Sequence, residues 1–147
     1  MGILDTNILI HALTTDAHGA DCRRFLERVR EGEITVVLTS VVAFEFTYAV
    51  GRYAKQMTRE DIADYLVSVM ALPSVELEDE ILVDAARLWA KTPGLGFVHA
   101  YLGLRAEREG LPVFTKNVWH FERFDINVPS LLGSYTPQTS RPSSIGS

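Results

Sequence analysis

The chain has 147 residues, of which 47% are hydrophobic and 22% are charged, and its formal net charge is −5. This length fits one domain with one core. The single cysteine, Cys22, excludes an internal disulfide and agrees with a reducing cytoplasm, and no apolar run is long enough to span a membrane. A negative net charge does not indicate a nucleic-acid binder, but a nuclease that uses a divalent cation also concentrates carboxylates at its site.

Apolar periodicity predicts strands that alternate with helices, which is typical of an α/β sandwich with a mainly parallel sheet. The predicted strands are 3–4, 34–38, 75–77, 112–114 and 126–128. The predicted helices are 7–13, 19–30, 41–54, 58–71, 79–91 and 97–109. Thr58 opens its helix with a capping-box pattern, and Gly110 closes the last helix. We expect one domain over 1–133 and, because 134–147 is rich in Ser, Thr, Pro and Gly, a disordered tail.

The first candidate site residues are Asp5, Thr6 and Asn7, where the first strand gives way to a helix. Open α/β folds bind their ligands at the carboxyl ends of strands. The alternative is that Asp5 only caps the helix, which is a common use of aspartate.

Glu45 is the second candidate, because it lies in an otherwise apolar helical segment, 41–50. On such a face a carboxylate costs several kcal/mol unless it is paired or binds a metal. No lysine or arginine lies within one helical turn, although a distant arginine remains an alternative partner. A metal site shared with Asp5 is the interpretation we favour.

Two further candidates lie in the C-terminal third. Asn117 follows the predicted strand 112–114, so it would share a sheet edge with Asp5 and supply one neutral oxygen. His99 lies in an apolar helix, and Gly103 one turn later predicts open space beside its imidazole. His99 is either a satisfied, partly buried side chain or a site residue that contacts metal or RNA.

Basic residues form two groups, which we interpret either as solvated helix faces or as RNA contacts. The first is Arg23, Arg24, Arg28 and Arg30, and the second is Arg105, Arg108, Lys116 and Arg123. There is no Gly-rich phosphate loop, His-Glu-x-x-His, cysteine pair or Gly-x-Ser-x-Gly. Nucleophilic serine or cysteine catalysis and nucleotide-triphosphate hydrolysis therefore have no support.

From Ile3 to about Leu132 the chain resembles PIN domains, and VapC-type toxins in particular. ILDTNILIHAL is similar to the family's first motif, TSVVAFEFTYAV to its second, and GFVHAYLGLRAEREGLPVFTKNVWHFERF to its third and fourth. The resemblance implies a three-layer α/β/α sandwich with Asp5 and Glu45 as metal-binding acids. Two positions depart from the family's pattern, which has aspartate at His99 and commonly at Asn117.

The resemblance implies an endoribonuclease that uses Mg²⁺, or Mn²⁺, to activate water for attack on an RNA phosphodiester. Asp5 and Glu45 would bind the cation, and Thr6 and Asn117 would orient its water. With His99 in place of an acid, we expect weaker binding of Mg²⁺ and a relative preference for Mn²⁺. The implied partners are RNA, a VapB-like antitoxin and a second copy of the chain.

Two other functions remain open at this point. A degenerate PIN domain would bind RNA or an antitoxin without cutting, as the missing acid at His99 suggests. A phosphotransfer domain would also use an aspartate at a strand end. However, a dehalogenase-like phosphatase expects a second aspartate where this chain has Asn7, and a receiver expects an acid pair that does not adjoin Asp5.

Overall fold

The computed structural model describes residues 1–131, and the chain divides into two compact units between Pro93 and Gly94. The predicted tail, 134–147, lies outside the described residues. In residues 1–131, no helix is both long enough and apolar enough to cross a bilayer.

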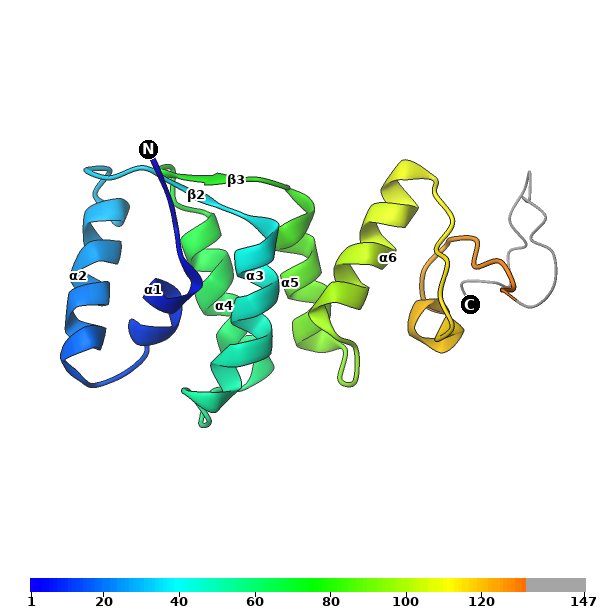
Figure 1. Ribbon diagram of the computed structural model, residues 1–147, viewed down its shortest axis with the longest axis horizontal. Helices are drawn as coiled ribbons and strands as arrows, with labels where there is room; N and C mark the ends of the chain where they lie inside the picture. Colours follow the sequence, from blue (N-terminus) through cyan, green and yellow to red (C-terminus); the bar gives the residue numbers. More distant parts are fainter. Residues whose placement is uncertain (132–147) are drawn as a thin grey trace. The chain divides into compact units, whose positions relative to one another are not determined.

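A parallel three-stranded sheet forms the first unit together with five α-helices, which confirms the predicted α/β fold (Figure 1). Its strands are β1 (Gly2–Ile3), β2 (Val36–Leu38) and β3 (Val75–Leu77), in the order β1-β2-β3. Ile3 lies opposite Val37, which lies opposite Glu76 on the other side. Because all strands run in one direction, their carboxyl ends lie at the same edge. β1 spans Gly2–Ile3 where residues 3–4 were predicted, and the side chain of Ile3 is exposed.

The α-helices of the first unit are α1 (Thr6–His11), α2 (Ala17–Arg30), α3 (Ser40–Ala49), α4 (Arg59–Met70) and α5 (Ile81–Lys91). Side chains cap three of these five helices, with Asp16 at α2, Thr39 at α3 and Thr58 at α4. Thr58 and Asp61 form the predicted capping box, which satisfies two backbone N–H groups at the start of α4. The helix predicted over 41–54 is shorter, because α3 ends at Ala49 and continues as a 3₁₀ turn, η1 (Val50–Arg52).

Buried aliphatic and aromatic side chains fix α1 and α3 against the rest of the first unit. Leu4, Leu9, Leu38 and Phe46 are almost fully buried. The hydroxyl of Tyr65 in α4 donates a hydrogen bond to the carbonyl oxygen of Leu9, at 2.9 Å. Burial raises the pKa of Tyr65, so this hydroxyl remains a donor. α1 is therefore anchored to the core of the first unit at Leu9.

The second unit is built around α6 (Phe97–Glu109), which has the predicted bounds and ends at Gly110 with a φ of 66°. A 3₁₀ helix, η2 (Val118–Phe121), follows. The predicted strands 112–114 and 126–128 are wrong, since neither segment is assigned as a strand. One bond, from the N–H of Val113 to the carbonyl oxygen of Asn127 at 2.9 Å, joins them without extending into a ladder.

Candidate functional site

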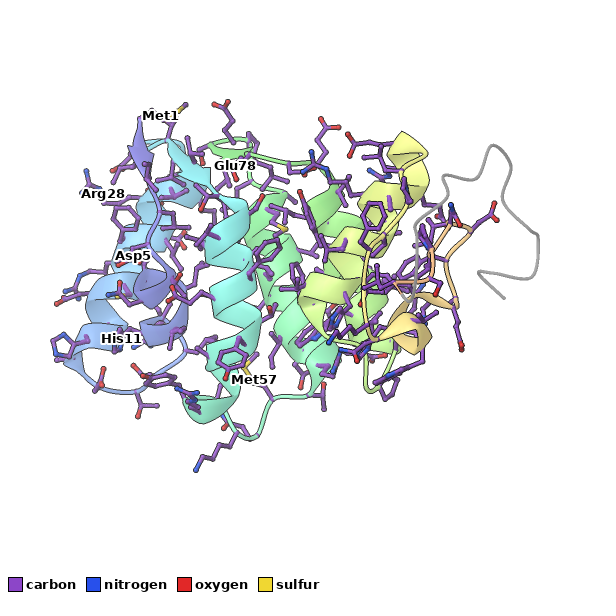
Figure 2. The ribbon with its side chains drawn as sticks, turned by 45° about the vertical axis from the view of Figure 1, so that its right-hand side comes forward. Met1, Asp5, His11, Arg28, Met57 and Glu78 are labelled. Atoms are coloured by element: carbon purple, nitrogen blue, oxygen red, sulfur yellow. The ribbon has the colours of Figure 1, made fainter. Side chains whose placement is uncertain are left out.

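Asp5, Thr6 and Glu45 line one open pocket of about 260 Å³ in the first unit. Its full lining is Asp5, Thr6, Asn7, Ile10, Glu45, Ala49, Arg52 and Tyr53. α1 and α3 pack together and carry most of these side chains, while Arg52 and Tyr53 follow α3. Figure 2 shows Asp5 where the chain passes from β1 into α1. Two acids that are far apart in the sequence therefore face one cavity at the carboxyl end of β1.

The carboxylate of Asp5 does not cap α1. Asp5 occupies the N-cap position with extended φ and ψ of −88° and 148°, but its side chain accepts no capping hydrogen bond. It forms no ion pair within residues 1–131, and it is exposed. The capping alternative therefore has no support, and the Asp5 carboxylate is available to a ligand.

Glu45 is exposed, so the argument that its burial demands a partner is wrong. Val41 and Tyr48, its neighbours along the helix, are 70% and 79% exposed. The apolar sequence of α3 predicted burial of Glu45, but no other element of the first unit covers this face of the helix. No arginine or lysine lies within ion-pair distance of Glu45 in the described residues. Its carboxylate is free, as that of Asp5 is.

Thr6 contributes a buried hydroxyl that has no hydrogen-bond partner in the described part of the chain. Its side chain is 3% exposed, and its Oγ1 is fully enclosed. A buried polar atom without a partner is costly, and such atoms mark places where a water or a ligand belongs. This hydroxyl adjoins the pocket that both carboxylates line.

The pocket presents the oxygen-rich donor set that a hard divalent cation prefers. It offers two carboxylates, the Thr6 hydroxyl and the Asn7 amide. Mg²⁺ is commonly held by one or two carboxylates and completes its shell with water and substrate phosphate. No group of three or more His, Cys, Asp or Glu side chains within 1–131 is placed to hold a metal. These donors fit a cation that two carboxylates bind and that water and substrate complete. They do not form a site in which the protein supplies every ligand.

His99 and Asn117, the other predicted site residues, lie in the second unit. The ring of His99 stacks on that of His120, with centroids 4.0 Å apart and planes 9° apart. Burial, and then the neighbouring His120, lower the pKa of His99. Asn117 is exposed and precedes η2, and its backbone N–H donates to Thr115 Oγ1 at 3.0 Å. Because the strand 112–114 is absent, the argument that put Asn117 at the edge of the sheet loses its premise.

Gly103 does not leave space beside His99, contrary to the prediction. A Cβ at Gly103 would overlap the ring of Phe124, so this glycine allows Phe124 to pack closely on α6. The imidazole of His99 instead lies close to Gly96, where a Cβ would be only 3.3 Å from Nδ1.

Most of the predicted basic groups are already paired with neighbours. Arg24, Arg28 and Arg30 form ion pairs with Asp21, Glu33 and Glu27 on the surface around α2. Arg23 donates to the carbonyl oxygens of Ala12 and Thr14, and Arg105 pairs with Glu109. These side chains support the interpretation of solvated helix faces.

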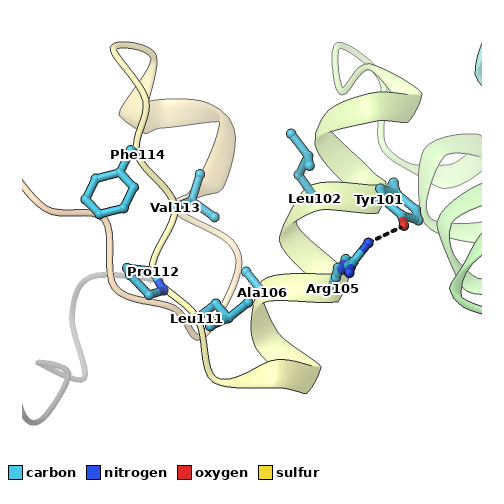
Figure 3. A pocket seen from close by; sticks show the side chains of 8 residues that line it. All are labelled: Tyr101, Leu102, Arg105, Ala106, Leu111, Pro112, Val113 and Phe114. Atoms are coloured by element: carbon cyan, nitrogen blue, oxygen red, sulfur yellow. Dashed lines mark hydrogen bonds between the residues drawn. The ribbon is translucent and has the colours of Figure 1, made fainter.

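A second pocket, of about 440 Å³, lies in the second unit between α6 and the extended segment that follows it (Figure 3). Its lining is Tyr101, Leu102, Arg105, Ala106, Leu111, Pro112, Val113 and Phe114. It is larger than the pocket at Asp5, but it contains no carboxylate and none of the predicted site residues. Its larger size alone therefore does not make it the candidate metal site.

The sequence interpretation missed three residues near the candidate sites: Arg52, Tyr53 and His120. Glu45, Ala49, Arg52 and Tyr53 all line the pocket at Asp5. Their spacing is that of one helix face, so the pattern could have identified Arg52 and Tyr53. No local signal predicts the stacking of His120 on His99, because it depends on how η2 packs against α6.

Comparison with known families matches residues 2–126 to the PIN domain family. The match covers most of the sequence, and the chain belongs to this family. PIN domains are generally nucleases, and they generally use divalent metals. No curated protein matches the chain.

Proposed function

We propose that this chain is a metal-dependent endoribonuclease of the VapC toxin type, with its reaction centre at the pocket of Asp5 and Glu45. The observation that carries the proposal is the convergence of two free carboxylates on one pocket in a chain of a nuclease family. Two like charges that share a site repel each other, and a bound cation would compensate that repulsion.

In the proposed mechanism, Asp5 and Glu45 would hold Mg²⁺ or Mn²⁺. When bound, the cation supplies an activated water and neutralises the charge that develops on the phosphodiester. The Thr6 hydroxyl, which lacks a protein partner, orients water in the pocket. The resemblance to the family implies a similar role for the amide of Asn117. Attack of water forms a new P–O bond as the scissile P–O bond breaks; the attacking water loses a proton to solvent, and the leaving ribose oxygen takes up a proton.

His99 would alter the choice of metal in this proposal. The resemblance places an aspartate at this position, and an imidazole is a softer ligand than a carboxylate. Mg²⁺ binding would therefore be weaker, and Mn²⁺ would be relatively favoured. Titrating RNA cleavage with both ions in the wild type and in His99→Asp checks this. Equal Mg²⁺ dependence of the two proteins would reject it.

A second candidate is a degenerate PIN domain that binds RNA or an antitoxin without efficient cleavage. It is favoured by the lack, within residues 1–131, of a cluster of three metal-binding side chains. Purified wild type and His99→Asp incubated with structured RNA distinguish the two functions. Cleavage by His99→Asp alone would favour the degenerate domain.

The proposed partners are those of a cytoplasmic toxin: a VapB-like antitoxin and a second copy of the chain. The pocket of the second unit supports a binding surface there, because three of its apolar side chains are exposed: Leu102, Leu111 and Phe114. Co-purification with the product of the adjacent gene tests the antitoxin, and the mass of the purified chain in solution tests the dimer.

Cleavage of an end-labelled single-stranded RNA tests the proposed activity. We expect the wild type to cleave the RNA with Mn²⁺ or Mg²⁺ and to be inactive in EDTA. Asp5→Asn and Glu45→Gln should each lose most activity, and Glu31→Gln, an exposed acid after α2, should retain it. Full activity of Asp5→Asn and Glu45→Gln would place the reaction elsewhere.

A further inference from the structure

Arg52 lines the same pocket as Asp5 and Glu45, yet it forms an ion pair with neither within the described chain. Its guanidinium carbon instead lies 5.5 Å from the centroid of the Tyr48 ring. Tyr48 belongs to α3, and Arg52 to the 3₁₀ turn that follows it. The positively charged guanidinium of Arg52 thus lies against the ring of Tyr48, at the rim of a pocket that two carboxylates line.

This arrangement differs from that of the arginines on α2. Arg24, Arg28 and Arg30 each contact a carboxylate of a nearby residue. Arg52 lines a pocket with two unpaired carboxylates but forms no ion pair with them in the described residues. Its contact with the Tyr48 ring leaves the N–H donors of the guanidinium unused. A cation–π contact at an exposed site contributes about 0.5–1 kcal/mol, which orients the side chain but allows it to move toward a ligand.

The chemistry of this rim is suited to a single-stranded polynucleotide. A guanidinium binds phosphate oxygens through two parallel hydrogen bonds. Tyr48 and Tyr53 are 79% and 55% exposed, so both rings are accessible to bases. Unpaired bases stack on such rings in single-stranded RNA recognition, whereas bases within a duplex are not available.

We propose that Arg52, Tyr48 and Tyr53 form the contact that seats single-stranded RNA at the pocket. Arg52 binds a phosphate next to the scissile one, and the tyrosine rings stack on neighbouring bases. Arg52 also offsets the negative potential of Asp5 and Glu45, which would otherwise repel the backbone of the substrate. The inference rests on the proposed nuclease function, since it places RNA over the two carboxylates.

Binding without catalysis tests this inference. The probe is a fluorescein-labelled single-stranded RNA of twelve nucleotides, with anisotropy measured in EDTA so that no cleavage occurs. Arg52→Gln should weaken binding about tenfold, as expected for loss of a charged hydrogen-bonding partner. Tyr48→Leu should weaken it about fivefold or more through loss of stacking. Circular dichroism of each variant should match that of the wild type, because both side chains are exposed.

Arg87 provides a matched control on the same unit. It is exposed, it has no ion pair in the described residues, and it lines a pocket with Glu60 and Asp64, but no tyrosine lines that pocket. Arg87→Gln should bind the probe as the wild type does. Equal weakening by Arg87→Gln and Arg52→Gln would show only nonspecific charge attraction and would overturn the proposal. Equal affinity of the wild type for duplex and single-stranded RNA would overturn it as well.

The two proposals fail in different ways. If Arg52→Gln keeps full affinity while Asp5→Asn abolishes cleavage, the RNA contact is wrong and the nuclease function stands. If Arg52→Gln weakens binding but the wild type cuts no RNA with either metal, the contact stands and the nuclease function is wrong.

Discussion

The carboxylates of Asp5 and Glu45 face one pocket, and neither is hydrogen bonded or ion paired within residues 1–131. Asp5 is positioned by the end of β1, and Glu45 by the middle of α3. The core residues Leu4, Leu9 and Phe46 fix these two elements. Packing of the surrounding core therefore brings the two acids together. Neither carboxylate contributes a hydrogen bond or an ion pair that would hold it in place within the described residues. This is the arrangement expected of a site that is completed by a ligand.

Thr6→Val should leave the free energy of unfolding in EDTA unchanged or raise it by up to about 1 kcal/mol. The substitution removes a buried hydroxyl that has no partner, and it keeps the shape of the side chain. Ser74→Ala is the control, because Ser74 is also buried but its hydroxyl donates to the carbonyl oxygen of Val29. Ser74→Ala should cost about 1–3 kcal/mol in urea unfolding. A similar loss for Thr6→Val would show that its hydroxyl is satisfied in the protein.

Arg59→Ala should destabilise the first unit by about 1–2 kcal/mol, because one side chain links α4 to α5 in two ways. Nε and one terminal nitrogen of Arg59 donate to the carbonyl oxygen of Trp89, at 3.0 and 2.7 Å. The guanidinium carbon also lies 4.3 Å from the centroid of the Trp89 ring. Urea unfolding, with Arg87→Ala as the exposed control, measures the effect. Equal midpoints for Arg59→Ala and Arg87→Ala would contradict it.

Gly103→Ala should destabilise the second unit by about 1–3 kcal/mol, the usual cost of overpacking. The added methyl would overlap the ring of Phe124. Gly51→Ala is the control, since a Cβ there meets no atom within 4 Å. Combining Gly103→Ala with Phe124→Leu should recover part of the loss, because the smaller side chain gives room. If the single variant unfolds at the wild-type midpoint, Phe124 does not pack on α6 in solution.

The free energy of unfolding should decrease as the pH is lowered through the range where histidines titrate. His99 should account for part of this decrease. Its pKa in the folded protein is lowered by burial and by His120, so the unfolded chain binds the proton more tightly. The contribution of His99 is fully present above its unfolded pKa of about 6.5 and is lost as the pH falls through the folded value. Urea midpoints at several pH values should therefore change less in His99→Gln than in the wild type. Identical pH profiles would contradict this.

Local signals predicted the helices well because caps and breakers act over a few residues. The capping box at Thr58 and the glycine stop at Gly110 both formed as expected. The strands predicted at 112–114 and 126–128 did not form, because an apolar run reveals nothing about whether a partner strand lies beside it. β3, which does pair with β2, has the predicted bounds.

The site was predicted in part and for partly mistaken reasons. Asp5 and Thr6 follow from the rule that ligands lie at strand ends, which is independent of burial. Glu45 was selected because a buried carboxylate needs a partner, but the side chain is exposed. Arg52 was overlooked although its spacing from Glu45 and Ala49 is that of one helix face, whereas the stack of His99 on His120 depends on packing that sequence spacing does not encode.

Direct titration of Mn²⁺ into the purified protein, followed by calorimetry, is the most decisive measurement of the central claim. The account predicts saturable binding of one ion per chain by the wild type and by Glu31→Gln. It predicts loss of that binding in the double variant of Asp5→Asn and Glu45→Gln, with the folded structure retained because both acids are exposed. Undiminished binding of Mn²⁺ by the folded double variant would contradict the account.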